Sequence, residues 1–528
     1  MELAAARFPG FPSTVQDSVR YHTVLLVALI DILALVSIHS LYWLLAGLNQ
    51  PIADLHQFRQ TQTAITAYWI WRGGPLLAYE TPVLGFPWSV PFEFPVYQYL
   101  LAAMRLIGIP LEAGGRLLSF AFYLGLLWPL KVLFRNLGLG LIDYLILSIL
   151  LLSAPIYVYW SRTVMMESCA LFFATAWLAF LVQFLRTHAS KDAWITIAFG
   201  TLAVLTKLTT FAAFGLLGGI AFVHAAVVAF RGGLTRSSDR VLVWAVLAGI
   251  LPIFSGVAWV FYSDHLKLAN LLGSQLTSQV LAGWNFGSIE QRFSSRFWLG
   301  AISNRMLPDI FGFSLIPALI AGGAALGSRK YAWLLGLSIL GFFTPLLIFT
   351  NLHFEHNYYQ YANALFLLAV AGFGLAKLAE SGRAALSAVL LVVIVGGQLI
   401  YFNANFARVI AADYSGSRQV AVGSLAKQLT TPDASLLIIG DDWNSAIPYH
   451  AERRALAIPY TAQSDSVTKI LADPQAYLGD APLGAIIYCP DQVGNYPSNQ
   501  TEIRQFVSGR KSLGAAAGCQ IFTPYRQP

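Results

Sequence analysis

Hydrophobic residues in this chain are gathered into blocks of about twenty, separated by short polar stretches. Runs such as 24–47 and 384–402 carry almost no charge and do not alternate between polar and apolar positions. An α-helix rising ~1.5 Å per residue needs about twenty apolar residues to cross ~30 Å of hydrocarbon. A transmembrane β-strand instead needs about ten residues of alternating polarity. The pattern therefore predicts an all-α polytopic membrane protein.

The number and position of these blocks predict about eleven transmembrane helices by the window-length criterion. They lie at 24–47, 116–134, 141–158, 166–185, 193–208, 210–230, 241–262, 310–326, 331–349, 359–378 and 384–402.

Lysine and arginine in the short connections predict the orientation, because such loops stay cytoplasmic. They accumulate at 131–135, 186–191, 231–240 and 377–383, and these fall on one side only if 93–109 does not cross. The aromatic, proline-broken sequence of that stretch suits a helix lying at the membrane surface. We therefore expect a cytoplasmic N-terminus, a first external loop at 48–115 with interfacial helices, a second long external segment at 263–309, and an external C-terminus.

After residue 402 the chain changes character, with charged residues throughout and two short apolar runs, SLLIIG and GAIIYCP. A membrane domain at 1–402 followed by a soluble α/β domain at 403–528 fits usual domain sizes. Cys489 and Cys519 lie in this tail, and their spacing leaves open whether they pair after export. Asp441 and Asp442 follow the first apolar run, where α/β domains place ligand sites, although a solvated turn explains them equally.

Composition supports the membrane assignment. Of 528 residues, 57% are hydrophobic and 11% charged, whereas a soluble domain carries about a quarter charged residues. The net charge of +7 is scattered between apolar blocks, which argues against a nucleic-acid partner. The chain also has no phosphate-binding GxxxxGK[ST] loop, so we do not expect an ATP-driven pump.

Ionisable residues near membrane spans are costly and therefore mark candidate functional positions. Asp54, His56 and Arg59 follow the first span in ADLHQFRQTQTA. A carboxylate there suits a general base acting on a hydroxyl group, and a helix N-cap or a surface ion pair is the structural alternative. Glu93, in the interfacial stretch, needs either a cationic partner or a route to water.

Three further loops carry such residues on the same predicted side. Arg162 and Glu167 in SRTVMMES could pair with each other or both face a polar cavity. Lys207 in LTKLTT needs either an anionic partner, such as a phosphate group, or a route to water by snorkelling. The sequence NLHFEHNYYQYAN brings His356 and Tyr359 to a span end, where two histidines without a third ligand are weak metal ligands and tyrosines also serve as interface aromatics. We expect a lipid-facing external active site.

These features resemble the GT-C glycosyltransferases, and among them the protein O-mannosyltransferase and aminoarabinose transferase (glycosyltransferase family 39-like) group. The resemblance rests on an Asp in the first external loop, an acid after an Arg-containing second loop, a TK pair at an outer span end, and a His/Tyr-rich loop. It implies transfer of a sugar from a polyprenyl-phosphate carrier to a lipid, glycan or protein acceptor, at the outer face of a bacterial inner (plasma) membrane.

The resemblance also implies roles for individual residues. Asp54 is the expected general base and Glu167 the second acid of the site. The phosphate of the donor is expected to contact Arg59, Lys207, His356, Tyr359, Arg162 and Tyr358. Relatives often have Lys-Pro-Pro or His-Pro-Pro where this chain has EFPVY, and often DE where it has DLHQFR. Glu93 and His56 are therefore expected to contact the sugar or the acceptor.

Other functions remain open on sequence alone. A transporter or flippase of a lipid-linked or anionic substrate also needs polytopic helices with buried charges, but no inverted repeat is visible in the chain. A non-enzymatic lipid-binding or assembly protein would not need Asp54. A diphosphate-linked donor would require a divalent metal, so we favour a monophosphate donor, no metal site and no cofactor.

Overall fold

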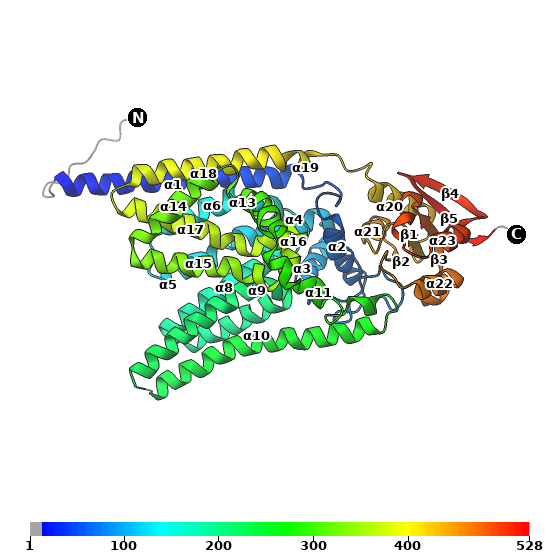
Figure 1. Cartoon of the computed structure of the whole chain (residues 1–528), viewed down its shortest axis with the longest axis horizontal. Helices are drawn as coiled ribbons and strands as arrows, with labels where there is room; N and C mark the ends of the chain where they lie inside the picture. The colour runs from blue at the N-terminus through cyan, green and yellow to red at the C-terminus, as the bar shows by residue number, and fades with distance from the viewer. Residues whose placement is uncertain (1–12, 234, 527–528) are drawn as a thin grey trace.

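The computed structural model describes residues 13–233 and 235–526. A long bundle of helices occupies one part of the molecule, and a small sheet with its own helices lies at one end of it (Figure 1). The first helix, α1 (Ser13–Ala46), packs against α6 (Leu141–Ser153), where the Ser40 hydroxyl donates to the carbonyl oxygen of Leu152 at 2.9 Å. Near its end it meets α18 (Ala384–Asn405), where the Trp43 and Phe402 rings lie 5.6 Å apart. The predicted cytoplasmic N-terminus lies outside the described residues.

The remaining helices of the membrane part follow in chain order. They are α2 (Gln57–Trp71), α3 (Val96–Leu106), α4 (Leu111–Gly125), α5 (Leu127–Asn136), α6 (Leu141–Ser153), α7 (Pro155–Trp160), α8 (Glu167–Thr187), α9 (Ser190–Arg231), α10 (Arg236–Leu268), α11 (Ala282–Phe286), α12 (Ile289–Phe293), α13 (Leu307–Phe311), α14 (Leu315–Ala324), α15 (Arg329–Ile348), α16 (Thr350–Glu355), α17 (Tyr361–Glu380) and α19 (Ala407–Ala411), with shorter or irregular helical turns at η1 (Gly273–Leu276), η2 (Arg296–Met306), η3 (Ala325–Gly327) and η4 (Asn357–Gln360).

By length and composition, 8 described helices can cross a membrane, or 9 if the pair Arg296–Phe311 and Leu315–Gly327, bent by 80°, forms one span. The number falls from the predicted eleven to nine for two reasons, and to eight when the bent pair, which contains the predicted span 310–326, is not counted. The predicted spans 193–208 and 210–230 both fall within α9, and the predicted span 141–158 is interrupted between α6 and α7 at Ala154 and Pro155. The protein is an integral membrane protein with several spans.

Helix α9 is not a single straight rod. Lys207 has non-helical dihedral angles, with φ −166° and ψ 98°. A methyl group placed on Gly200 would lie 2.5 Å from the indole of Trp177, and one placed on Gly218 would lie 2.3 Å from the same indole. Eighteen residues of straight helix would separate the two glycines by ~27 Å, so α9 turns back at Lys207. The two predicted spans are its two limbs, and both pack on α8.

The stretch predicted to lie at the membrane surface forms α3, an 11-residue helix. At ~1.5 Å per residue it extends only about 17 Å, which is too short to cross a bilayer. Leu106 and Ile107 at its end are 73% and 76% exposed. A short helix with exposed apolar residues agrees with an interfacial position.

The C-terminal part is an α/β domain built on a five-stranded sheet of order β2-β1-β3-β5-β4. Its strands are β1 (Ser435–Ile439), β2 (Arg454–Ala457), β3 (Leu483–Tyr488), β4 (Arg510–Ala516) and β5 (Cys519–Arg526). Its helices are α20 (Arg418–Leu429), α21 (Ala446–Ala451), α22 (Ser464–Ala472) and α23 (Gln500–Val507), with shorter turns η5 (Pro474–Tyr477) and η6 (Pro490–Asn495). Strand β1 pairs in parallel with β2 and β3, whereas β5 pairs antiparallel with β3 and β4.

The sequence of this domain explains its core. All five residues of β1 are buried, as expected for a parallel strand covered on both faces. Cys489, just after β3, and Cys519, at the start of β5, form a disulfide. The predicted combination of an all-α polytopic membrane part and a C-terminal α/β domain is therefore confirmed.

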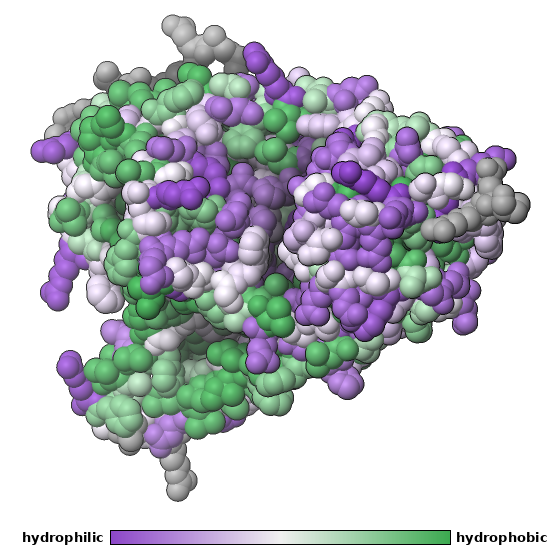
Figure 2. Space-filling view, turned by 45° about the vertical axis from the view of Figure 1, so that its right-hand side comes forward, coloured by the Kyte–Doolittle hydropathy of each residue, from purple (hydrophilic) through white to green (hydrophobic). Residues whose placement is uncertain are grey.

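The long loops of the membrane part and the C-terminal domain meet at one end of the bundle. Leu84 forms a β-bridge with Leu456 of β2, and the Asn270 side chain donates to the carbonyl oxygens of Gly85 and Pro87, both at 3.0 Å. Figure 2 shows hydrophilic residues gathered over this end and apolar residues over the helices. Parts of the first long loop, of the segment that follows α10 and of the C-terminal domain therefore lie together at this end of the bundle.

Candidate active site

Asp54 lies in the loop between α1 and α2, and it is 7% exposed. Its Oδ2 accepts a hydrogen bond from Arg162 Nη1 at 3.1 Å, and its Oδ1 accepts one from Gln60 Nε2 at 2.6 Å. His56, and not Asp54, is the N-cap residue of α2. Asp54 is therefore not a helix N-cap. It forms an ion pair that is buried rather than at the surface, and hydrogen bonds hold both of its carboxylate oxygens.

Gln60 connects Asp54 to the loop after α7. Its Oε1 accepts a hydrogen bond from the Val164 backbone N–H at 3.0 Å while its amide nitrogen donates to Asp54. Gln60 itself is fully buried in α2. One side chain thus fixes the distance between the first external loop and the loop that contains Arg162.

Glu167 begins α8 and pairs with Lys207 from the turn of α9. Lys207 Nζ donates to both oxygens of Glu167, each at 2.6 Å, and the two side chains are 3% and 2% exposed. The anionic partner predicted for Lys207 is therefore Glu167. One alternative from the sequence was that Arg162 and Glu167 pair with each other, and the structure shows that they do not. Each pairs with a residue from another segment.

The His/Tyr-rich segment covers Lys207. Lys207 Nζ lies 4.0 Å from the ring centre of Tyr359 and 5.1 Å from that of Tyr358. Such cation–π contacts are strongest when the ammonium group is desolvated. The break in α9 at Lys207 thus places this charge between an acid and two aromatic rings.

Arg59 of α2 pairs with Glu93, which precedes α3, and also donates to Gln62. Burial opposes the charge on Arg59, but the neighbouring Glu93 carboxylate raises the pKa of Arg59 above its ordinary value. Burial likewise raises the pKa of Glu93, but the charge of Arg59 outweighs burial and the net shift is downward. Both groups are therefore ionised at neutral pH, and the cationic partner expected for Glu93 is Arg59.

His56 and His356 meet above this cluster. His56 Nε2 and Asn357 Oδ1 lie 3.0 Å apart, and the two imidazole rings are 5.4 Å apart, with Tyr358 stacked on His356 at 5.2 Å. Burial, with nearby cationic groups, lowers the pKa of His356 to about 4. His356 is therefore neutral at pH 7 and can offer a hydrogen bond but no positive charge to an anion.

The residues predicted as a site thus form two adjoining groups at the same end of the bundle. One group is the Asp54–Arg162 pair with Gln60, and the other comprises Arg59, Glu93, Glu167, Lys207, His56, His356, Tyr358 and Tyr359. Within residues 13–233 and 235–526, no three His, Cys, Asp or Glu side chains are placed to hold one metal ion. Each acid of the site already has its own cation.

An apolar cavity of about 700 Å³ lies among α5, α8, α9, α15 and α17, and no residue of the candidate site lines it. Its walls include Phe214 and Leu217 of the second limb of α9, and Leu365 and Phe366 of α17. Phe214 is seven residues after Lys207, which corresponds to about 10 Å along a helix. The cavity continues to Arg186 near the opposite end of the bundle, so an apolar space follows the same helix limb that begins at Lys207.

Several residues that shape the site were not expected from the sequence. Gln60 and Gln62 orient Asp54 and Arg59, Asn357 holds His56, and Arg305 donates to the carbonyl oxygens of His353 and Phe354. Arg116 is 1% exposed and donates to the carbonyl of Leu48 at 3.0 Å and to that of Gln50. The only sequence signal for these residues is polarity near span ends, which many unrelated surface residues share.

Comparisons with known proteins give a structural relationship but no sequence relationship. No protein-family profile matches the chain, and no curated protein matches it by sequence. Two solved structures of ArnT from Cupriavidus metallidurans are similar over almost the whole length. The structure bound to undecaprenyl phosphate has a TM-score of 0.61 at 14% identity, covering 96% of this chain and 99% of ArnT. The apo structure has a TM-score of 0.60 at 14% identity, covering 96% and 100%.

An oligosaccharyltransferase from Archaeoglobus fulgidus, in complex with zinc and sulfate, is more distant. Its TM-score is 0.48 at 13% identity, with 88% of this chain and 68% of that chain covered. The ArnT comparison shows that this chain shares the fold of ArnT over nearly its whole length, including the C-terminal domain.

Proposed function

We propose that this protein is a glycosyltransferase that moves a sugar from a polyprenyl-phosphate carrier to a lipid, glycan or protein acceptor. The observation that carries the proposal is the position of Lys207. Its ammonium group lies among Glu167, Arg59 and two tyrosine rings, and the helix limb that it begins descends along an apolar cavity. A lipid phosphate needs this combination of cations above and apolar walls below.

The fold shared with ArnT supports the same proposal. ArnT has been solved bound to undecaprenyl phosphate. In this chain the phosphate would contact Lys207, Arg59 and Tyr359, and Arg162, Tyr358 and neutral His356 would add hydrogen-bond donors or ring contacts. Glu93 and His56, beside Arg59, would contact the sugar or the acceptor.

The proposed reaction is a single displacement at the anomeric carbon of the sugar. The acceptor oxygen forms the new bond, its proton passes to Asp54, and the bond from the sugar to the phosphate breaks with its electron pair on the phosphate. Arg162 and Gln60 hold Asp54 in orientation, and the cations stabilise the charge on the leaving phosphate. Glu167 acts as the second acid by fixing the ammonium group of Lys207.

We propose that no divalent metal takes part. Asp54, Glu93 and Glu167 are each engaged by a separate cation, which leaves no shared set of carboxylates for an ion. Transfer is therefore expected to persist in EDTA. Loss of transfer in EDTA and its recovery with magnesium or manganese would contradict this part of the proposal.

We further propose that the protein lies in a bacterial inner membrane with the site and C-terminal domain outside the cytoplasm. The positive residues at 186–191, 231–240 and 377–383 support this orientation. It is tested with single cysteines placed at Asp465, on the C-terminal domain, and at Lys330, at the start of α15, and with a membrane-impermeant maleimide on intact spheroplasts. Labelling at 465 and not at 330 supports the orientation, and the reverse pattern contradicts it.

The deciding experiment measures transfer of radiolabelled sugar from a panel of polyprenyl-phosphate donors to a membrane lipid extract by purified protein in nanodiscs. We expect Asp54→Asn to reduce transfer by about 10²- to 10⁴-fold, and Asp465→Asn, an exposed carboxylate, to leave it unchanged. Equal transfer by wild type and Asp54→Asn would remove Asp54 from the chemistry. No transfer with any donor would contradict the enzyme assignment and favour a transporter or flippase.

A further inference from the structure

The strand order of the C-terminal domain creates a place where α/β domains bind ligands. Strands β2 and β3 lie on opposite sides of β1, so the chain leaves β1 towards one edge and returns at the other. Ligands bind outside the carboxyl ends of parallel strands at such a switch point. Here those ends carry Asp441, two residues after β1, and Asp491, three residues after β3.

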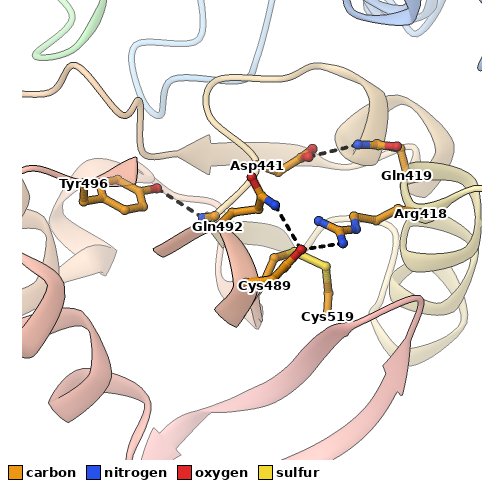
Figure 3. Close-up of a disulfide and its surroundings, with 9 residues drawn as sticks. Arg418, Gln419, Asp441, Cys489, Gln492, Tyr496 and Cys519 are labelled. Carbon is orange, nitrogen blue, oxygen red and sulfur yellow. Dashed lines mark hydrogen bonds and ion pairs between the residues drawn. A yellow bond between two sulfur atoms is a disulfide. The ribbon is translucent and has the colours of Figure 1, made fainter. Parts of the chain in front are cut away.

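Asp441 lies at the carboxyl end of β1, and one of its carboxylate oxygens has no hydrogen-bond partner. The residue is 9% exposed, and its Oδ1 accepts a hydrogen bond from Gln419 Nε2 at 3.0 Å. Its Oδ2 is buried and has no hydrogen-bond partner. Leaving a buried acceptor unpaired costs about 1–3 kcal/mol, so a donor from a bound ligand or a water molecule would stabilise this oxygen. Figure 3 shows Asp441 beside Gln419, with Arg418, Gln492 and the disulfide next to them.

The surroundings define the chemistry of that donor. Arg418 is already paired with Asp491 at 2.6 Å, and Asp442 adds another carboxylate that acts on Asp441. The Tyr460 ring, near both aspartates, packs edge-on against Tyr496 at 5.2 Å. Among the residues that the structure describes, no group of three acids converges on a metal position. Acidic acceptors, amides and aromatic rings together suit a sugar ring with hydroxyl or ammonium donors.

We call the group of Arg418, Gln419, Asp441, Asp442, Tyr460 and Gln492 the switch-point cluster. It adjoins the candidate active site through Trp443, whose ring lies 4.7 Å from Phe58 and 6.0 Å from Phe92. Phe58 precedes Arg59 and Phe92 precedes Glu93 in the chain. Since two residues span at most ~7 Å, Asp441 is one short loop away from the contact with the active-site helix α2.

We propose that the switch-point cluster is a recognition site for the acceptor, in which Asp441 accepts a hydrogen bond from a hydroxyl or ammonium group on an acceptor sugar. This inference rests on the proposed glycosyltransferase function and adds a substrate class to it. An acceptor held there would lie beside α2, with its reacting hydroxyl directed towards Asp54.

The test measures sugar binding directly and needs no turnover. Full-length protein in nanodiscs is mixed with methyl β-glucoside or with glucosamine, and saturation-transfer-difference NMR reports contact. We expect a signal with wild type and with Asp54→Asn, and at least a fivefold weaker signal with Asp441→Leu. Asp441→Asn keeps one oxygen acceptor and serves as the second variant if Asp441→Leu does not fold. Asp465→Asn is the matched control.

Methyl β-glucoside and glucosamine distinguish a hydroxyl donor from an ammonium donor. Signals with both sugars identify a hydroxyl contact, and a signal with glucosamine alone identifies an ammonium contact. Either result supports sugar binding at the switch-point cluster if Asp441→Leu weakens the signal. No signal from wild type with either probe, or equal signals from wild type and Asp441→Leu, would overturn the proposal. Binding of polyprenyl phosphate is measured on the same samples. If that binding is absent while Asp441-dependent sugar binding remains, the proposed function fails and the sugar site stands.

Discussion

Ion pairs in the membrane part and in the C-terminal domain have opposite surroundings. The side chains of the Asp54–Arg162 and Glu167–Lys207 pairs are between 2% and 3% exposed, whereas Lys469 and Asp465 on α22 are 58% and 75% exposed. A buried pair must recover a desolvation cost of several kcal/mol per ion and is seldom a gain in stability over apolar residues. An exposed pair has a small desolvation cost and contributes little to the free energy of unfolding. The difference indicates that the buried pairs are kept for chemistry, and the following changes test that interpretation.

The largest expected effect is on sugar transfer by Lys207→Met. In the proposed reaction the ammonium group of Lys207 stabilises the leaving phosphate, and deleting one such preorganised group typically lowers the rate by about 10²- to 10³-fold. The measurement is the initial rate of transfer together with binding of polyprenyl phosphate. The double variant Lys207→Met/Glu167→Gln, which leaves no unpaired charge, should be equally inactive. Transfer restored in the double variant would show that only charge balance matters there.

The next effect is on folding, through Glu167→Gln. This change leaves Lys207 charged, buried and without its partner, and breaking a buried pair in this way costs about 3–5 kcal/mol. Unfolding in mixed micelles measures the free energy. The double variant with Lys207→Met should recover most of that loss, because no uncompensated charge remains. A single variant as stable as wild type would contradict the view that this pair is tightly coupled.

A smaller effect concerns the C-terminal domain and pH. Burial raises the pKa of Asp441 to about 7, with smaller influences from Gln419, Arg418, Asp442 and Asp491. Because the folded-state pKa is the higher one, the stabilisation is complete below about pH 4 and is lost as the pH rises through about 7, with a slope of up to about 1.4 kcal/mol per unit. Unfolding of the domain followed from pH 5 to 8 should show this slope in wild type and a smaller slope in Asp441→Asn. Identical slopes would place the titration elsewhere.

The smallest effect is expected at the exposed pair. Asp465→Asn removes the partner of Lys469 at the surface of α22, where water already solvates both charges. Neither transfer nor the unfolding midpoint should change measurably. A clear loss of either would show that α22 takes part in a contact with another molecule, and the comparison between buried and exposed pairs would then need that contact included.

The fold was largely predictable because hydrophobic block length reports directly on membrane crossing. Most of the spans and the α/β tail follow from local composition, but the predicted span 141–158 is divided between α6 and α7. The helix turn at Lys207 was anticipated only as a boundary between two blocks, and the bend of 80° between Phe311 and Leu315 was not expected. Lys207 is flanked by ordinary helix-compatible residues, so composition does not mark the break there, whereas the second bend includes Gly312, whose φ is 60°.

The sequence predicted which residues belong to the candidate site better than it predicted which of them contact each other. Asp54, Arg59, Glu93 and Lys207 stand out because charges near apolar blocks are rare. Their pairing does not, since Glu167 and Lys207 are forty positions apart and Asp54 and Arg162 more than a hundred. Gln60 and Asn357 are ordinary polar residues in the sequence. Only packing shows that they hold Asp54 and His56.

The sequence by itself determined that the chain spans a membrane repeatedly, that its polar chemistry lies at one side, and that a soluble α/β domain follows. These properties depend on the local free energy of placing each segment in lipid or water, which composition fixes. The tertiary structure alone decided which charges pair, that Cys489 joins Cys519, that Trp443 places the C-terminal domain against α2, and that Asp441 keeps an unused oxygen. Such contacts join residues far apart in the chain, and their energies depend on distance and burial, which appear only after the helices and strands have packed.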